Sequence, residues 1–400
     1  MLTQPRSPRP SSNILARRLA SPLSCCALGL VFALATAAGC SGASSSGDTS
    51  NPPAQAAATP TIATTPAQNG AVIVTLTDTT PGATLYYSMD GSTPSETSIR
   101  YFAPFLVASN LTLHVIAAEP PAYLNSKVAT QTFSPGIASG TLVWSDEFNA
   151  ASTSAQPNPS TWTYDTGLNC CGNNELETYC AWASTTGPCT PSSPNAFLGT
   201  DGYLHIVAEN PSSGVYTSAR LKSQGLFSFQ YGRIEARMML PESQGMWPAF
   251  WLLGNNIATV SWPACGEDDI MEHIDGSNPP FSVGAAPPGY DWIAGSVHGG
   301  TSSNEANGSE RYNPSGFSAA AWHTYGMIWS KGQVQYYVDS PSNIYATFTP
   351  ANFPGTWPFD QGPMFILLNL AVGGDWPGPP NASTVFPSTL LIDYVRIYTN

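Results

Sequence analysis

The chain consists largely of short runs with strand character, and it contains no sustained run of apolar residues at helical spacing. Its 35 glycines and 37 prolines favour short strands joined by turns over long helices. Runs of alternating or β-branched residues occur at 72–76, 84–88, 111–116, 204–208, 231–238, 334–338 and 390–398. Many short strands without intervening helices predict an all-β protein made of sandwiches and not a barrel of βα units.

The length of 400 residues predicts two folded units with appendages. We expect a small β-sandwich at residues 60–134 and a large one at residues 141–400, joined by a linker at 135–140. Residues 40–59 are mostly Ser, Ala, Pro and Gly, a composition typical of a flexible tether.

The first 39 residues have the features of a secretory signal peptide. Arginines precede an apolar stretch at about 28–38, which is too short to span a bilayer. Residues 37–40 (Ala-Ala-Gly-Cys) resemble a bacterial lipobox, which predicts cleavage after residue 39 and lipidation of Cys40. Conventional cleavage nearby is the alternative. The protein is therefore expected to be exported, as a lipoprotein of the outer membrane or cell surface or otherwise as an extracellular protein.

The mature chain is strongly acidic. Four of the 13 Lys and Arg residues lie before Cys40, and none of the 26 Asp and Glu residues do. Nine basic and 26 acidic residues leave a net charge of −17. Such a surface argues against nucleic acid and, less firmly, against sulfated glycans, so a neutral polymer is the easier partner. Membrane contact is expected only through the lipid on Cys40, and a monomer is the expected state.

Five cysteines follow the tether, namely Cys170, Cys171, Cys180, Cys189 and Cys265. Export makes disulfides plausible, and the first four cysteines fall within one loop-like stretch. Two local disulfides with Cys265 free is the preferred arrangement, although the pairing cannot be deduced from the sequence. A zinc cluster is the alternative, but no histidine lies near that stretch.

An acidic cluster at residues 267–272 (Glu-Asp-Asp-Ile-Met-Glu) lies in an apolar, aromatic neighbourhood, although only 10% of the chain is charged. On a strand, Glu267 and Asp269 share one face, whereas Glu272 has the wrong parity. A β-bulge at 270–271 would return Glu272 to that face. The two glutamate Cα atoms would then lie roughly 13 Å apart, with their carboxyls near the ~5–5.5 Å separation that retaining glycosidases use. This spacing predicts acid–base chemistry on a sugar.

The alternative is a surface acidic run with an accidental bulge, because short motifs carry false positives. Other catalytic signatures are missing from the large unit: the sequence has no Gly-rich phosphate loop between a strand and a helix, no His-x-x-x-His pattern and no Gly-x-Ser-x-Gly elbow.

Seven phrases of the large unit, in the same order, resemble glycoside hydrolase family 16, specifically its laminarinase-like endo-β-1,3-glucanases. They lie at 143–148, 172–176, 216–221, 245–251, 266–272, 322–325 and 369–378. The resemblance implies a curved jelly-roll β-sandwich of the concanavalin-like type, with a long open cleft on its concave face.

The resemblance also implies catalytic roles. Glu267 would be the nucleophile of a double displacement, Glu272 the general acid and base, and Asp269 the group that tunes the pair. The chain departs from the family at Asp268, where Ile, Leu or Val is usual. Strand alternation sends this carboxyl between the two sheets, where it needs a partner such as His273, an arginine or water, or else lowers stability.

Further site residues are implied by the same resemblance. Sugar-stacking platforms would be Trp247, Trp251 and Trp376, of which Trp251 could instead be a core residue. Hydrogen bonds to sugar hydroxyls or to the nucleophile would come from Asn174, Arg220 and Asn369. His298 would line the cleft, although a lone histidine is often structural. Glu147 and Asp393 match positions near a structural Ca²⁺ site, and no cofactor is expected for catalysis.

Residues 82–94 resemble the small Ig-like β-sandwich of the chitobiase C-terminal type, which is appended to bacterial polysaccharide enzymes. Tyr86, Tyr87 and Tyr101 could bind glycan there, but a sandwich of this size needs its aromatics for its own core.

The expected function is a retaining endo-β-1,3-glucanase that acts on laminarin-type glucans. Hydrolysis of another polymer, such as mixed-linkage β-glucan or a galactan, and non-catalytic β-glucan binding are the alternatives.

Overall fold

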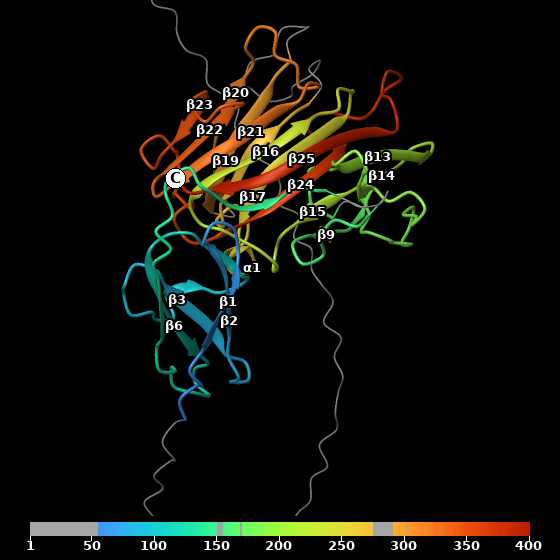
Figure 1. Cartoon of the computed structure of the whole chain (residues 1–400). Helices are drawn as coiled ribbons and strands as arrows, with labels where there is room; N and C mark the ends of the chain where they lie inside the picture. The colour runs from blue at the N-terminus through green and yellow to red at the C-terminus, as the bar shows by residue number, and fades with distance from the viewer. Residues whose placement is uncertain (1–54, 150–154, 169, 275–290, 302) are drawn as a thin grey trace, which may run out of the picture. The chain divides into compact units, whose positions relative to one another are not determined.

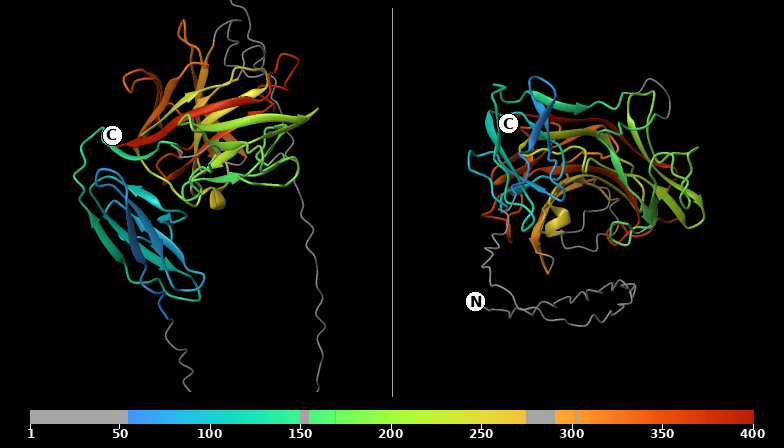
Figure 2. Two further views of the ribbon diagram at one scale, coloured as in Figure 1. Left: turned by 45° about the vertical axis from the view of Figure 1, so that its right-hand side comes forward. Right: turned by 90° about the horizontal axis from the view of Figure 1, so that it is seen from below.

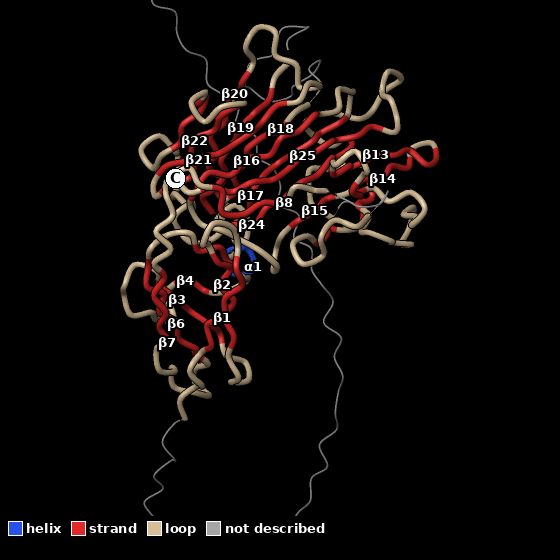
Figure 3. The backbone as a smooth tube through the Cα atoms, in the orientation of Figure 1, coloured by secondary structure: helices blue, strands red, loops and turns tan. Residues whose placement is uncertain are grey.

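The computed structural model describes residues 55–149, 155–168, 170–274, 291–301 and 303–400. The regular secondary structure of the described part is almost entirely β-strand, and α1 (Ile257–Val260) is its only α-helix (Figures 1 and 3). Nowhere in these residues is there a helix of the length and hydrophobicity needed to cross a membrane. The predicted signal peptide and Cys40 lie outside the described residues, so lipidation stays a prediction.

Two small sheets form the N-terminal part of the described chain. One has the order β1-β2-β5 and the other β4-β3-β6-β7. Their strands are β1 (Thr61–Pro66), β2 (Val72–Thr77), β3 (Thr84–Ser88), β4 (Ile99–Arg100), β5 (Phe105–Val107), β6 (Leu111–Ala118) and β7 (Ala129–Phe133). Tyr87 is buried and stacks on Phe105, and Tyr101 packs edge-on against the same ring. These two tyrosines therefore contribute to the core of this sandwich.

Two large sheets build the rest. The first has the order β10-β11-β14-β13-β25-β16-β21-β22-β23, with β12 paired to β13 and β8 to β25. Its strands are β8 (Leu142–Asp146), β10 (Gly167–Leu168), β11 (Glu177–Tyr179), β12 (Ala196–Leu198), β13 (Leu204–Ser212), β14 (Val215–Ser218), β16 (Gly232–Met239), β21 (His323–Ser330), β22 (Gln333–Val338), β23 (Ile344–Phe348) and β25 (Ser388–Tyr398).

The second large sheet has seven strands in the order β20-β19-β18-β17-β24-β15-β9. They are β9 (Thr163–Asp165), β15 (Arg220–Lys222), β17 (Met246–Gly254), β18 (Glu267–Glu272), β19 (Ile293–Thr301), β20 (Asn304–Tyr312) and β24 (Met364–Val372). Figure 2 shows the strands of the two large sheets as stacked, curved layers. The all-β, jelly-roll class predicted from the sequence is confirmed.

Strand alternation gives the seven-stranded sheet two different faces. On β24, Ile366, Leu368 and Leu370 enter the main core between the large sheets. Leu367 points the other way, into a small apolar cluster that also contains Trp251. The main core therefore holds one face of this sheet, and the other face is left for a cleft.

Candidate active site

Strand β18 contains the predicted β-bulge. Two consecutive residues of β17, Trp251 and Phe250, lie opposite Asp269 and Met271, so Ile270 is the extra residue. The pairing of β18 with β19 shifts over the same stretch. An extra residue restores the facing of the side chains that follow it.

The bulge sorts the side chains of β18 as the parity argument requires. Ile270 and Met271 are buried in the main core. Glu267, Asp269 and Glu272 all line one cleft of about 780 Å³ over the other face of the sheet. The three predicted acids are thus brought together, and their catalytic roles follow only from the proposal below.

Each of the two glutamates accepts a hydrogen bond from a tryptophan indole. Nε1 of Trp262 donates to Oε2 of Glu267 at 3.0 Å, and Nε1 of Trp247 donates to Oε1 of Glu272 at 2.9 Å. Both tryptophans line the cleft. With one oxygen of each carboxyl held in this way, the side chains are fixed in orientation before any substrate binds.

A histidine links the acids to the edge of the sheet. Nε2 of His298 lies 3.1 Å from Oδ2 of Asp269 and 4.0 Å from Oε1 of Glu267, and Nδ1 lies 2.8 Å from Oε1 of Glu305. Burial disfavours the imidazolium, but the hydrogen bonds with Asp269 and Glu305 outweigh it and raise the pKa of His298 well above its usual range. His298 therefore supplies positive charge in the middle of the acids, and it lines the cleft as expected.

The environment raises the pKa of both glutamates, but the groups that oppose the rise differ between them. Burial and then the charge of Asp269 raise the pKa of Glu267 to about 8, against the opposing effects of His298, Arg220 and the Trp262 hydrogen bond. Burial and Asp269 also raise the pKa of Glu272 well above its usual range. Arg220 and His298 both favour the anion of Glu267, so the positive charges of the cleft favour ionisation of this carboxyl. One deprotonated and one protonated carboxyl is the state that acid–base catalysis on a glycoside needs.

The floor beside the acids is a chain of contacts from strands β15, β24 and β17. The guanidinium of Arg220 lies 4.5 Å over the ring of Trp251, and its Nε donates to Asp165 at 3.0 Å. Nε1 of Trp251 donates to Oδ1 of Asn369 at 2.8 Å. All but Asp165 line the cleft. Trp251 is largely covered, so its ring supports Arg220 and Asn369 more than it offers a face to a sugar.

Aromatic rings form a second part of the cleft wall. The ring of Trp376 lies 5.4 Å from that of Trp247 and 5.8 Å from that of Trp292, as centroid distances. Arg311 from β20 places its guanidinium 4.2 Å over Trp292. Trp247 and Trp376 thus lie where the resemblance placed sugar platforms, with Trp292 as an additional ring.

Asn174 does not line the cleft. It is exposed, and its Nδ2 lies 3.0 Å from both carboxylate oxygens of Asp375. Other residues of the same loop do line the cleft, namely Cys171, Gly172, Asn173 and Glu175. The expected contact of Asn174 with substrate or nucleophile is therefore not supported, because its side-chain amide is bound to Asp375.

Sequence reasoning missed Trp262, Trp292, Glu175 and Arg311. Two of these residues could have been found from the sequence. Trp262 precedes the acidic cluster by only five residues, and Glu175 belongs to one of the phrases that resemble the family. Trp292 and Arg311 could not be found in this way, because both reach the cleft through pairings that join distant parts of the chain.

The residues expected near Ca²⁺ do not fit such a site. Both carboxylate oxygens of Glu147 accept hydrogen bonds from Arg396, at 3.0 and 2.8 Å. Oδ2 of Asp393 accepts one from Arg237 at 2.6 Å. A calcium site needs several oxygen ligands without a competing cation, and these two acids already neutralise arginines.

The cysteines form two disulfides in the described residues, Cys170–Cys171 and Cys180–Cys189. Cys265 is free and buried. Two local disulfides with Cys265 free is the arrangement preferred from the sequence, although the partners could not be deduced there.

Asp268 is fully buried between the large sheets, as strand alternation predicted. Its Oδ1 lies 3.1 Å from the hydroxyl oxygen of Tyr336, which in turn lies 2.6 Å from the carbonyl oxygen of Ser296. The expectation of His273 as partner was wrong, because His273 follows the bulge and its Nδ1 lies 2.7 Å from the carbonyl oxygen of Trp292.

Burial raises the pKa of Asp268 well above its usual range despite the hydrogen bond with Tyr336. A neutral Asp268 can itself donate to the Tyr336 oxygen, which leaves the tyrosine proton for the Ser296 carbonyl. In this series of hydrogen bonds each proton has one acceptor. The hydrogen bonds reduce the free-energy cost of burying the acid but do not make its burial favourable.

Replacing Asp268 with isoleucine is expected to raise the free energy of unfolding by about 1–3 kcal/mol at neutral pH while leaving activity within about twofold. Unfolded aspartate ionises near pH 3.9, whereas folded Asp268 stays protonated, so its cost begins above about pH 4 and grows as the pH rises. The gain should therefore be largest at high pH and shrink toward pH 3. Melting temperatures across this range test it, with Asp268→Asn as the isosteric control. A clear fall in both stability and activity would refute it.

Paired glutamates on the floor of a tryptophan-walled cleft, in a two-layer β-sandwich, define a glycoside hydrolase that acts on a polysaccharide. The family model of glycosyl hydrolases family 16 matches residues 189–395. A second model, described as Fn3 associated, matches residues 74–133 and supports an additional N-terminal domain. Its specific likeness to the chitobiase type stays a prediction.

Two curated relatives illustrate the match. The chain is 36% identical over 270 residues to the beta-glucanase of Rhodothermus marinus. The alignment covers 64% of this chain and 84% of that protein. It is 32% identical over 283 residues to glucan endo-1,3-beta-glucosidase A1 of Niallia circulans. That alignment covers 66% of this chain and 38% of the longer relative. The chain belongs to glycoside hydrolase family 16.

Solved structures agree. The laminarinase catalytic domain of Thermotoga maritima superposes with a TM-score of 0.53 at 33% identity, covering 66% of this chain and 99% of that one. The laminarinase of Rhodothermus marinus gives a TM-score of 0.51 at 35% identity, covering 65% and 97%.

Proposed function

We propose that this protein is a retaining endo-β-1,3-glucanase that cleaves laminarin-type glucans by double displacement. The observation that carries the proposal is the bulged strand β18, which presents Glu267, Asp269 and Glu272 to one cleft and leaves each glutamate bound to an indole N–H. Non-catalytic binding would not need an acid and a base held in different protonation states.

In the first step, the carboxylate of Glu267 forms a bond to the anomeric carbon while Glu272 gives its proton to the departing glycosidic oxygen. The indole of Trp262 occupies Oε2 of Glu267, so Oε1 is the attacking atom. The indole of Trp247 occupies Oε1 of Glu272, so the transferred proton resides on Oε2. In the second step, Glu272 takes a proton from water, the water oxygen bonds to the anomeric carbon, and Glu267 leaves as a carboxylate.

An endo mode of action is supported by the cleft. Its lining residues come from strands across the seven-stranded sheet, from Glu305 and Arg311 on β20 to Arg220 on β15. Six strands spaced about 4.8 Å apart make a floor of roughly 24 Å, which accommodates a chain of several sugars on both sides of the bond that breaks.

Specificity for β-1,3 linkages is supported by relatives whose names include laminarinase or endo-1,3-beta-glucosidase. The second candidate is mixed-linkage hydrolysis. It is favoured by EglC of Rhizobium meliloti, an endo-1,3-1,4-beta-glycanase that is 31% identical over 288 residues.

The test is release of reducing ends from laminarin, lichenan and agarose, with the configuration of the new reducing end followed by NMR. We expect rapid release from laminarin with the β-anomer appearing first. Release of reducing ends from lichenan alone would favour the mixed-linkage candidate. Release from agarose alone would indicate a galactanase. An α-anomer would refute retention. Binding of laminarin without release from any polymer would make the protein a glucan-binding protein.

A further inference from the structure

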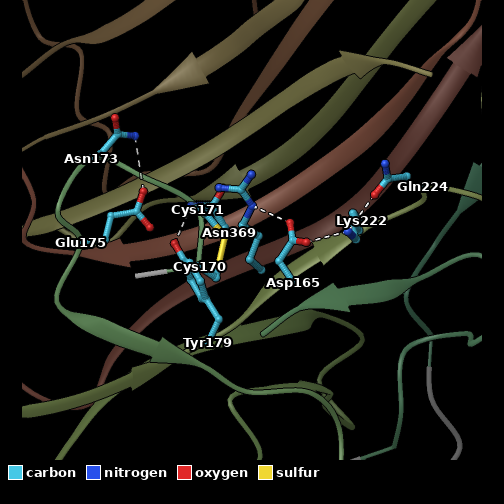
Figure 4. Close-up of a disulfide and its surroundings, with 10 residues drawn as sticks. Asp165, Cys170, Cys171, Asn173, Glu175, Tyr179, Lys222, Gln224 and Asn369 are labelled. Atoms are coloured by element: carbon cyan, nitrogen blue, oxygen red, sulfur yellow. Dashed lines mark hydrogen bonds and ion pairs between the residues drawn. A yellow bond between two sulfur atoms is a disulfide. The ribbon is translucent and has the colours of Figure 1, made fainter. Parts of the chain in front are cut away.

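Two adjacent cysteines, Cys170 and Cys171, are joined by a disulfide (Figure 4), and Cys171 lines the cleft. We propose that this disulfide is a sugar-binding surface, which forms a subsite for a glucosyl unit of the substrate remote from the bond that is cleaved. The inference rests on the proposed function, because it concerns the same cleft.

The position of the disulfide fits a remote subsite. Cys171 lines the cleft together with Arg220 of β15 and Asn369 of β24, which lie opposite each other in the sheet. Strand β15 is three positions from β18 in the seven-stranded sheet. At about 4.8 Å per strand this is roughly 14 Å, so the disulfide would meet a sugar about two or three units from the catalytic acids.

The exposure of its two cysteines distinguishes this disulfide from the buried one between Cys180 and Cys189. Cys180 and Cys189 bury their bridge, with 4% and 8% of each residue exposed. Cys170 is exposed and Cys171 is only half-buried. A bond between neighbouring cysteines closes a small ring that carries no polar side-chain group. Sulfur is soft and polarizable, so this ring offers an apolar surface to the C–H face of a pyranose, as an aromatic ring does.

The polar groups that a sugar also needs stand beside the ring. Asn173 and Glu175 line the cleft from the same loop, and Nδ2 of Asn173 lies 3.5 Å from Oε1 of Glu175. Figure 4 shows Asn173 and Glu175 on the loop that follows the disulfide. An apolar surface with a few convergent polar groups is the usual composition of a ligand site.

Glu175 is held as an acceptor by its neighbour Glu177. Burial and then the charge of Glu175 raise the pKa of Glu177 to about 8. Glu177 therefore favours its protonated form and can donate a hydrogen bond to the carboxyl group of Glu175. Although Glu175 is only 4% exposed, that exposure faces the cleft, where a carboxylate accepts hydrogen bonds from sugar hydroxyls.

The covalent ring also fixes the loop. Gly172, Asn173 and Asn174 follow it with φ values of 100°, 56° and 53°, all in the left-handed region. Three such residues in a row need local support, since this region disfavours most side chains. A loop fixed before binding loses less entropy when a sugar is bound.

The test compares Cys170→Ala/Cys171→Ala with a matched control, Cys180→Ala/Cys189→Ala, which removes the buried disulfide of the same region. KM and kcat are measured on laminari-oligosaccharides of increasing length. We expect the first variant to raise KM by about tenfold, or about 1.4 kcal/mol, only for oligomers long enough to reach the disulfide, with kcat little changed. The control should change melting temperature without changing the dependence of KM on length.

An unchanged KM at every length in a folded Cys170→Ala/Cys171→Ala protein would overturn the inference. So would an equal loss at every length, which would indicate a purely structural role. If that variant does not fold, reduction of the wild-type protein replaces it, with mass spectrometry identifying which disulfide has opened. Calorimetric binding of the same oligomers to a Glu267→Ala background tests the subsite even where laminarin is not hydrolysed, which separates its failure from that of the proposed function.

Discussion

Glu267→Ala is expected to lower kcat on laminarin by about 10⁴-fold or more, the scale that follows removal of a group acting in covalent catalysis. The variant lacks the oxygen that bonds to the anomeric carbon, whereas Asp269 and Glu272 remain in the cleft. Azide can occupy the space left by the carboxylate and attack the same face of the sugar. The expected product of rescue is therefore the α-glucosyl azide, which NMR distinguishes from the β-anomer.

Glu209→Gln on β13 is the matched control, since this carboxylate does not line the cleft. Its activity should equal that of the unchanged protein. A Glu267→Ala variant that keeps a tenth of the activity, or that yields the β-azide, would show that Glu267 is not the nucleophile.

Glu272→Gln is expected to lower kcat/KM on laminarin by about 10²–10⁴-fold, the usual contribution of general acid–base catalysis. An aryl β-glucoside with a good leaving group needs no protonation of its glycosidic oxygen, so the rate of the first step on this substrate should be little changed. The second step still lacks its base, so a burst of phenol followed by slow turnover is expected. Stopped-flow measurement of the phenol tests this, and an equal loss on both substrates would contradict the role.

The pH profile gives an independent check of the same assignment. The acid must be protonated, and burial raises the pKa of Glu272, so activity of the unchanged protein should fall on the alkaline side only above neutral pH. The nucleophile must be ionised, and the raised pKa of Glu267 moves the acidic limb above that of an ordinary glutamate. In Glu272→Gln the alkaline limb should disappear while the acidic limb stays.

The sequence predicted the strand-rich fold and the face of the catalytic strand for a local reason. Side-chain alternation and its interruption at Ile270 depend only on neighbouring residues, so the arrangement of Glu267, Asp269 and Glu272 could be worked out before any contact was known. The inward direction of Asp268 followed from the same rule.

Contacts between distant residues could not be predicted in this way. The partner of Asp268 is Tyr336, which lies 68 positions further along the chain and on the other large sheet. Arg311 reaches Trp292 because β20 pairs with β19. The disulfide between Cys170 and Cys171 is local, yet four nearby cysteines allow several pairings, and spacing does not choose among them.

The bulge and the length of β18 compensate for each other. Loss of one residue between Asp269 and Glu272 would leave a strand without a bulge, in which plain alternation sends the remaining apolar side chain into the core and the glutamate into the cleft. The same three acids would therefore share one face in a shorter strand. A deletion of one residue here is thus a change that the cleft can absorb, whereas a bulge removed without a deletion would turn Glu272 into the core.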